Sequence, residues 1–161
     1  SSENGLPMLR ALFVEFPNDP GSWLVDDQYL FGADILVAPL FENVTERNVY
    51  LPKGKWIDYQ TNKVYEGGWH SINSGDIPII MLVKDGTILP HIKLAQSTKD
   101  MDWSALELKV YATDITKASC KLYVPNDTNL YNLEVVKKGN SFELVKNSFE
   151  GKIKFKISTI K

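Results

Sequence analysis

Residues 5–17 have the sequence Gly-Leu-Pro-Met-Leu-Arg-Ala-Leu-Phe-Val-Glu-Phe-Pro, on which the interpretation of the whole chain depends. Residues 8–16 are almost continuously apolar and are interrupted only by Arg10 and Glu15. An apolar run of this length that ends at a proline predicts a strand buried on both faces, as in a parallel sheet. Residues 1–4 are too few to supply a neighbouring strand. We therefore expect the chain to be the C-terminal piece of a larger protein.

Four short blocks follow one another between residues 5 and 90. The first contains Gly5-x-Pro7-x-x-Arg10 and then Leu12-Phe13-x-Glu15-Phe16-Pro17-x-Asp19. The second contains Asp27-Gln28-Tyr29-Leu30-Phe31-Gly32 and then Ile35-Leu36-Val37-Ala38-Pro39. The third and fourth are Tyr50-Leu51-Pro52-x-Gly54-x-Trp56-x-Asp58 and Val83-x-x-Gly86-x-Ile88-Leu89-Pro90. In this order the blocks resemble the last barrel strand and the following β-domain of glycoside hydrolase family 31, and the resemblance fades beyond Gln96.

The resemblance implies a mainly β fold, with two antiparallel β-sandwich domains that follow the last strand and a short helix of a (β/α)8 barrel. The expected domains are the barrel end over residues 1–32, a proximal sandwich over 33–97 and a distal sandwich over 98–161. The resemblance also implies that the parent is a retaining, exo-acting α-glycosidase, in the first place an α-glucosidase, that hydrolyses terminal α-linked glucosides or xylosides. Such enzymes use two carboxylates about 5 Å apart as nucleophile and acid/base.

The family's catalytic positions have no match in this sequence. The family's nucleophile is the Asp of a Trp-x-Asp box followed by Met or Gly, then Asn or Ser, and then Glu. Here Trp56-Ile57-Asp58 is followed by Tyr59-Gln60-Thr61 and fits a strand of the β-domain instead. We therefore assign no catalytic, substrate-binding or metal-binding residue, and we expect the chain alone to be inactive.

Three carboxylates near the expected barrel end, Glu15, Asp19 and Asp26, nevertheless invite a catalytic interpretation. The alternative is that Glu15 is a hydrogen-bonded strand residue and that the two aspartates are turn or cap residues. The sequence Asn-Asp-Pro-Gly-Ser at residues 18–22 is dense in turn formers. We favour the structural interpretation.

Four aromatic residues raise a different function class. Because sugars stack on flat rings, Trp23, Trp56, Trp69 and Tyr65 would suit a free-standing, non-catalytic carbohydrate-binding module. Tryptophans on strands of small β-domains more often anchor a core. Trp69 follows two glycines and is expected to be more exposed than Trp56. The opening strand without a partner also disfavours a free-standing module.

Composition limits the partners. The 161 residues are 43% hydrophobic and 24% charged, as in an ordinary globular chain. With a net charge of −2 and no long apolar run, neither nucleic acid nor a membrane is expected as a partner. Residues 1–100 carry 8 basic and 13 acidic side chains (−5) and the remainder 10 and 7 (+3), in keeping with two domains. The expected partner is the N-terminal catalytic barrel portion of the same enzyme, which would hold the oligosaccharide; homo-oligomerisation is left open.

The cysteine and histidine content bears on disulfides, compartment and metal binding. The single cysteine, Cys120, excludes an internal disulfide and favours the cytoplasm, although the compartment is left open. His70 and His91 are too far apart, and too poor in neighbouring ligands, to predict a metal site. No cofactor is expected.

Most of the remaining elements are expected to be strands. The sequence predicts a short helix over residues 23–31 that ends at Gly32, strands over 35–40 and 47–51, and a hairpin that joins 56–59 to 63–65. Gly67-Gly68 is expected to break the pattern. Residues 77–89 are predicted to form a core hairpin that turns at Asp85-Gly86, and residues 93–102 a linker.

Alternating side chains predict half-buried strands in the last third of the chain. The apolar positions are Leu106, Leu108 and Val110 in one strand and Cys120, Leu122 and Val124 in the next. Residues 133–136 and 141–145 are expected to pair across a turn at 137–140. Lys152, Lys154 and Lys156 alternate with apolar residues, which indicates an exposed or edge strand more than a polyanion-binding stripe.

Overall fold

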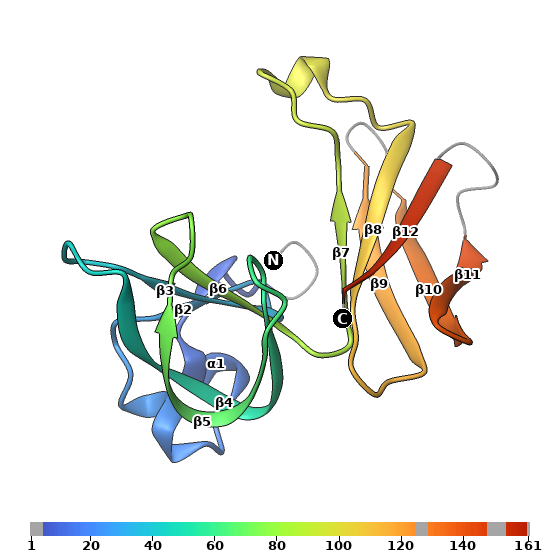
Figure 1. The fold of residues 1–161 in the computed structure, drawn as a ribbon. Coiled ribbons are helices and arrows are strands. Elements are labelled where there is room, and N and C mark those ends of the chain that lie inside the picture. Colours follow the sequence, from blue (N-terminus) through green and yellow to red (C-terminus); the bar gives the residue numbers. More distant parts are fainter. Residues whose placement is uncertain (1–4, 125–128, 148–153, 161) are drawn as a thin grey trace. The chain divides into compact units, whose positions relative to one another are not determined.

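The computed structural model describes residues 5–124, 129–147 and 154–160. The fold is mainly β, as predicted, and the chain divides into two compact units, Ser1–Asp85 and Gly86–Lys161 (Figure 1). The observed division lies twelve residues before the boundary that was expected between residues 97 and 98. Residues 93–102 therefore lie inside the second unit, where they connect two strands and include a short 3-10 helix, η2 (Thr98–Asp100).

The first unit is built on a six-stranded sheet. In chain order its strands are β1 (Leu9–Arg10), β2 (Tyr29–Phe31), β3 (Ile35–Pro39), β4 (Glu46–Asp58), β5 (Val64–Asn73) and β6 (Ile79–Lys84). They lie side by side in the order β1-β2-β3-β6-β4-β5, with every pair antiparallel. Two short helical elements, α1 (Leu12–Glu15) and the 3-10 helix η1 (Pro20–Trp23), come between β1 and β2. The side chains packed in this core include Leu12, Leu30, Leu36, Leu51, Trp56, Ile72 and Leu82.

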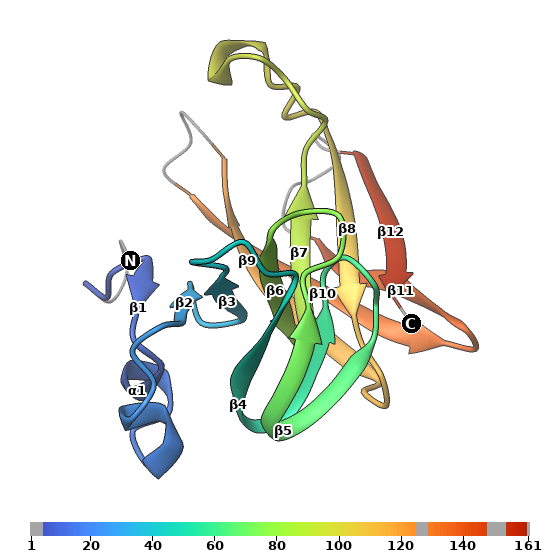
Figure 2. The same ribbon diagram turned by 60° about the vertical axis from the view of Figure 1, so that its left-hand side comes forward.

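The stretch from residue 8 to residue 16 is not the single buried strand that the sequence predicted. Only Leu9–Arg10 forms a strand, and it pairs antiparallel with β2 at one end of the sheet (Figure 2). A one-turn helix follows, and its successive side chains point in different directions. Within the stretch, Leu12 is fully buried, whereas Met8, which precedes the strand, is 58% exposed. The stretch joins the first unit through an antiparallel pairing and not through a parallel one.

The helix predicted over residues 23–31 is also wrong. Here η1 ends at Trp23, and the strand β2 forms the last three residues of this region. The physical reason is Gln28, which is buried and fastens the chain to the edge of β4. Its Nε2 donates to the carbonyl oxygen of Tyr50 at 2.5 Å, and its Oε1 accepts from the Tyr50 backbone N–H at 3.0 Å. These two bonds hold the segment extended.

The hairpin of β4 and β5 confirms one predicted turn and corrects one predicted break. The strands reverse at residues 59–63, where Asn62 has a φ of 63°. However, β5 runs unbroken through Gly67 and Gly68, opposite an irregularity in β4 between Leu51 and Lys55. A Cβ at Gly67 would lie 2.9 Å from the Cα of Lys53. Glycine is needed because the two backbones approach closely, and the strand continues through it.

The predicted core hairpin over residues 77–89 is wrong. β6 pairs with β3 and β4 in the first unit, whereas β7 (Thr87–His91) pairs with β8 (Ala105–Tyr111) in the second. The backbone N–H of Asp85 donates to Lys55, and that of Gly86 donates to Tyr111. The two turn residues therefore bond to different units, and the chain passes from one unit to the next instead of forming a hairpin.

The second unit is a sandwich of two three-stranded sheets (Figure 1). One has the order β12-β8-β7 and the other β11-β10-β9, where β9 is Lys117–Tyr123, β10 Leu130–Lys138, β11 Ser141–Asn147 and β12 Lys154–Ile160. The predicted alternation is confirmed, since Leu106, Leu108 and Val110 are buried. The β10–β11 turn lies at residues 139–140, as predicted.

Two features of this sandwich refine the prediction. β12 pairs parallel with β8, so the sheet β12-β8-β7 is mixed. β12 is an edge strand, and Lys154 and Lys156 are exposed on it, as expected for lysines that protect an edge. Lys152 lies outside the described residues.

Candidate functional site

Asp19 and Tyr50 form the centre of a polar cluster in the first unit. Asp19 precedes η1, and its Oδ1 accepts the backbone N–H of Gly21 at 3.1 Å, which caps this short helix. The same oxygen accepts from the Tyr50 hydroxyl at 2.6 Å. The other oxygen, Oδ2, is shielded from solvent and accepts no hydrogen bond within the structure. A buried acceptor without a donor is unusual in a folded protein.

The surroundings hold Tyr50 in one position. Gln28 binds both backbone polar groups of Tyr50, as described above. Gly21 lies directly against the tyrosine ring, since a Cβ at that position would be 2.2 Å from Cζ. Across the strand pair, Trp69 on β5 faces Tyr50, with ring centroids 5.3 Å apart. Trp69 is 62% exposed although it lies on a strand. A rigid tyrosine thus supports an exposed indole.

A hollow of about 510 Å³ opens beside this cluster. This volume lies within the range of about 300–1,000 Å³ that is usual for small-molecule sites. Its lining carries two acidic groups, one lysine, one amide and one hydroxyl, together with three glycines whose backbone is uncovered. The lining residues are Asn18, Asp19, Pro20, Tyr50, Leu51, Lys53, Gly54, Glu66, Gly67 and Gly68. We call this hollow, together with Trp69, which packs on the lining residue Tyr50, the Tyr50 site.

The carboxylate of Asp19 makes the Tyr50 hydroxyl a poor acid. Its hydrogen bond, with burial and the nearby negative charge as smaller causes, raises the pKa of Tyr50 to about 12 from 10.0. The stability that this bond contributes is therefore fully present below pH 10 and lost as the pH rises towards 12.

We expect a difference absorbance titration of tyrosinate, wild type minus Tyr50→Phe, to show a transition near 12. With Asp19→Asn in both proteins the transition should move down towards 10, because the charged acceptor is lost. A wild-type transition already at 10 would show that the Tyr50 hydroxyl does not bond to Asp19.

A second feature of the first unit is a concentration of exposed apolar side chains. Sixteen large hydrophobic residues are exposed in the described part of the chain, and eight of them fall between residues 6 and 31. We call these eight the N-terminal apolar side chains: Leu6, Met8, Leu9, Phe13, Val14, Trp23, Leu24 and Phe31. Phe13 and Trp23 stack with ring centroids 4.6 Å apart, and Leu24 is 84% exposed. Such a concentration is typical of an interaction surface.

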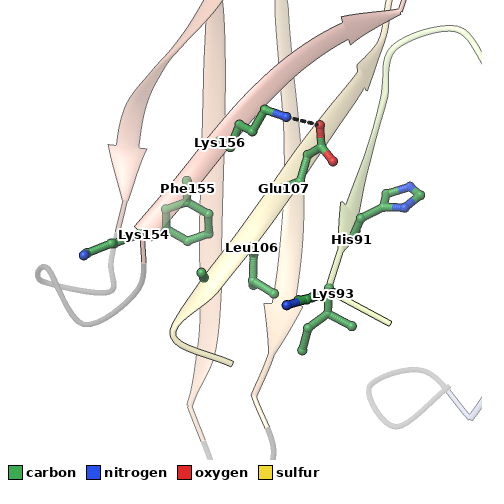
Figure 3. Close-up of a pocket in the computed structure, with 9 residues that line it drawn as sticks. His91, Lys93, Leu106, Glu107, Lys154, Phe155 and Lys156 are labelled. Carbon is green, nitrogen blue, oxygen red and sulfur yellow. Dashed lines mark ion pairs between the residues drawn. The ribbon is translucent and has the colours of Figure 1, made fainter. Parts of the chain in front are cut away.

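The second unit has its own hollow, of about 460 Å³, at one end of the sheet β12-β8-β7 (Figure 3). Ile92, Leu106 and Phe155 give it an apolar lining, and lysines lie around it. Glu107 pairs with Lys156 at 3.4 Å and accepts from Ser158; the Ser158 bond is the main cause that lowers the pKa of Glu107. Burial, followed by the charge of Lys109, lowers the pKa of His91. The acid at this hollow is thus already engaged with its neighbours.

The three carboxylates that the sequence singled out have separate tasks. Glu15 forms an ion pair with Arg10, Asp19 caps η1 and binds Tyr50, and Asp26 is exposed. The structure therefore supports the cap assignment for Asp19. Tyr50 was not predicted as a site residue, because it lies 31 positions from Asp19 and no local pattern joins the two.

The four aromatic residues do not form one platform. Trp56 is fully buried, and its Nε1 donates to the carbonyl of Pro52 at 2.8 Å. Trp23 stacks on Phe13, and Tyr65 lies against His70. Trp69 is more exposed than Trp56, as predicted.

The described residues contain neither a candidate metal site nor a candidate membrane-spanning helix. Among residues 5–124, 129–147 and 154–160, no group of three or more His, Cys, Asp or Glu side chains is placed to hold a metal ion. In the same part of the chain, no helix has the length and apolar character needed to span a membrane.

Comparison with known proteins places the chain among glycoside hydrolases. Residues 5–89 match the model of the glycosyl hydrolase family 31 C-terminal domain. "Alpha-glucosidase 2" of Bacillus thermoamyloliquefaciens is 35% identical over 123 residues, which are 75% of this chain and 16% of that protein. A "probable glucan 1,3-alpha-glucosidase" of Arabidopsis thaliana is 30% identical over 149 residues, 90% of this chain and 15% of that protein. The chain thus spans about a sixth of the length of these relatives.

A solved structure shows the same fold. The GH31 dextranase of Flavobacterium johnsoniae, in complex with glucose, matches 98% of this chain and 22% of its own with a TM-score of 0.79. Sequence identity to it is 22%.

Proposed function

Because the chain belongs to glycoside hydrolase family 31, with residues 5–89 matching its C-terminal domain, we propose that it is the non-catalytic C-terminal part of an α-glycosidase. The parent activity is that of a retaining, exo-acting enzyme, in the first place an α-glucosidase, on terminal α-linked sugars. The role of this part is to support the catalytic domain, which binds the oligosaccharide. The family membership and the short span relative to full-length relatives support this proposal.

The observation that carries the structural role is the set of N-terminal apolar side chains. These eight side chains are held by a folded unit with its own buried core, yet they face solvent. Burial of apolar surface in a domain interface stabilises both partners, by roughly 25 cal/mol for each Å² removed from water. The catalytic domain, which in larger enzymes of this family belongs to the same polypeptide, is the proposed partner of this surface.

The contacts of Glu15 and Asp19 support a non-catalytic role for this chain. Retaining glycosidases need two carboxylates about 5 Å apart, one of them protonated. Glu15 is paired with Arg10, and Asp19 with Tyr50 and Gly21. We therefore expect the purified chain to give no turnover of nitrophenyl α-glucoside. Turnover that is abolished by Asp19→Asn would contradict the proposal.

Leu24 allows a direct test of the apolar surface. In the complete enzyme, Leu24→Asp should place a charge in the domain interface and reduce the free energy of unfolding by about 1–3 kcal/mol. In the isolated chain the same change should have little effect, because Leu24 is 84% exposed there. Thermal inactivation of the enzyme and thermal melting of the chain measure the two effects.

The matched control for Leu24 is Leu94→Asp. Leu94 is also a leucine, is 96% exposed, and lies in the second unit. It should tolerate the charge in both proteins. If the Leu24 and Leu94 variants of the complete enzyme are equally stable, the N-terminal apolar side chains do not contact the catalytic domain.

A further inference from the structure

We propose that the Tyr50 site binds a neutral pyranose ring of an oligosaccharide, with Trp69 as the stacking surface. This inference does not rest on the proposed support of the catalytic domain. It would give the chain a carbohydrate-binding function of its own.

Trp69 is placed to stack on a sugar ring. An indole that is 62% exposed on a strand leaves a large flat apolar surface in contact with water. One side of it is supported by Tyr50, at 5.3 Å between ring centroids. Tyr50 is in turn fixed by Asp19, Gln28 and the close contact with Gly21. The indole is thus held in a defined orientation before any ligand binds, which lowers the entropic cost of stacking.

The hollow next to the hairpin of β4 and β5 is lined by polar groups that can bond to a sugar. Asp19 Oδ2 accepts nothing within the structure and is shielded from bulk solvent. A ligand hydroxyl can reach this oxygen only after the side chains that cover it move, so the polar groups open to a ligand are those of the rest of the lining. Asn18, Lys53 and Glu66 add an amide, an ammonium and a second carboxylate to the lining. Vicinal hydroxyls of a sugar can donate to the carboxylates and accept from the amide and the ammonium at the same time.

The charge of the lining residues favours a neutral ligand. The ionisable residues of the lining, Asp19, Glu66 and Lys53, sum to a formal charge of −1 apart from the protonated tyrosine. A phosphate or carboxylate ligand would be repelled by the two acids. A polyol without charge meets no such penalty and uses the same groups as hydrogen-bond partners.

The hollow has room for a sugar ring. Gly54, Gly67 and Gly68 leave one wall without side chains, and at Gly67 the approach of Lys53 leaves no room for a Cβ. The absence of side chains lets a ring approach the backbone closely. The hollow of about 510 Å³ is large enough for a small oligosaccharide.

The indole N–H resonances of the four tryptophans provide the test. The isotope-labelled 161-residue chain is titrated with isomaltotriose and with maltotriose at millimolar concentrations, and proton–nitrogen spectra are recorded. We expect the Trp69 resonance to shift in a saturable way and those of Trp23, Trp56 and Trp103 to stay in place. Glucose 1-phosphate, an anionic probe, should bind more weakly than either trisaccharide.

Two variants complete the experiment. Trp69→Ala should weaken binding at least about tenfold, because the stacking surface is lost. Trp23→Ala, which removes an indole of similar exposure (58%), should leave it unchanged. The proposal is overturned if neither trisaccharide shifts the Trp69 resonance of the wild-type chain, or if Trp69→Ala binds as well as the wild type. Neither result bears on the Leu24 test.

Discussion

A chain that begins at residue 32 is expected to lose the fold of its first unit. Leu12 and Leu30 are both fully buried in the core of this unit, and the truncation removes them together with β1, β2 and the two bonds from Gln28 to Tyr50. The loss of one buried leucine typically costs about 2–5 kcal/mol. Two such losses approach the whole stability of a typical domain, about 5–15 kcal/mol. Hydrogen exchange of β3 and β6 in the truncated chain should therefore approach that of an unfolded segment.

The buried barrel strand that the sequence predicts for residues 8–16 implies the opposite result. A strand severed from a barrel would expose apolar side chains and unpaired backbone groups. Its removal should therefore yield a more soluble monomer. The structure instead pairs Leu9–Arg10 with β2 inside the first unit. If the truncated chain keeps the unfolding transition of the intact one, residues 5–31 are an appendage after all.

A pair of leucine variants tests the same point without a truncation. Leu12→Ala should reduce the free energy of unfolding by about 2–5 kcal/mol in urea denaturation. Leu9→Ala should have an effect below about 1 kcal/mol, because Leu9 is 56% exposed. Equal effects would mean that the helix α1 does not direct Leu12 into the core.

The contrast between the two units shows where sequence patterns are informative. In the second unit, Leu106, Leu108 and Val110 alternate with polar residues because one face of the sheet is wet and the other is packed, so the period of two was sufficient. In residues 8–16 the apolar run has no such period. The run mixes a core residue, Leu12, with side chains that face solvent, and periodicity does not separate these two uses.

The Tyr50 site was harder to predict for a different reason. Asp19 was recognised as a cap or turn residue, and Trp69 as the more exposed tryptophan. What brings them together is the pairing of β4 with β5 and the contact of Gly21 with the Tyr50 ring. These are tertiary contacts between segments far apart in the sequence. The hairpin predicted to turn at Asp85-Gly86 was wrong for a similar reason, because the backbone hydrogen bonds of these two residues go to different units.

Trp56→Ala is expected to be the most damaging single substitution in the first unit. The indole is fully buried, lies edge-on to Phe16 at 6.2 Å between ring centroids, and donates to Pro52. Replacement by alanine should reduce the free energy of unfolding by about 3–5 kcal/mol, because it leaves a cavity and an unpaired carbonyl. Trp56→Phe should lose less, since the ring is kept and only the Nε1 bond is removed.

Trp69→Ala is the matched control for Trp56→Ala, since it removes the same side chain from the surface of the same hairpin. Trp69 is 62% exposed, so its loss should cost less than about 1 kcal/mol. Urea denaturation of both variants measures the difference. A large loss at Trp56 with little at Trp69 would assign one tryptophan to the core and leave the other available for a ligand. Comparable losses would mean that the exposed indole contributes to the stability of the first unit. The exposure of Trp69 would then no longer support sugar binding at the Tyr50 site.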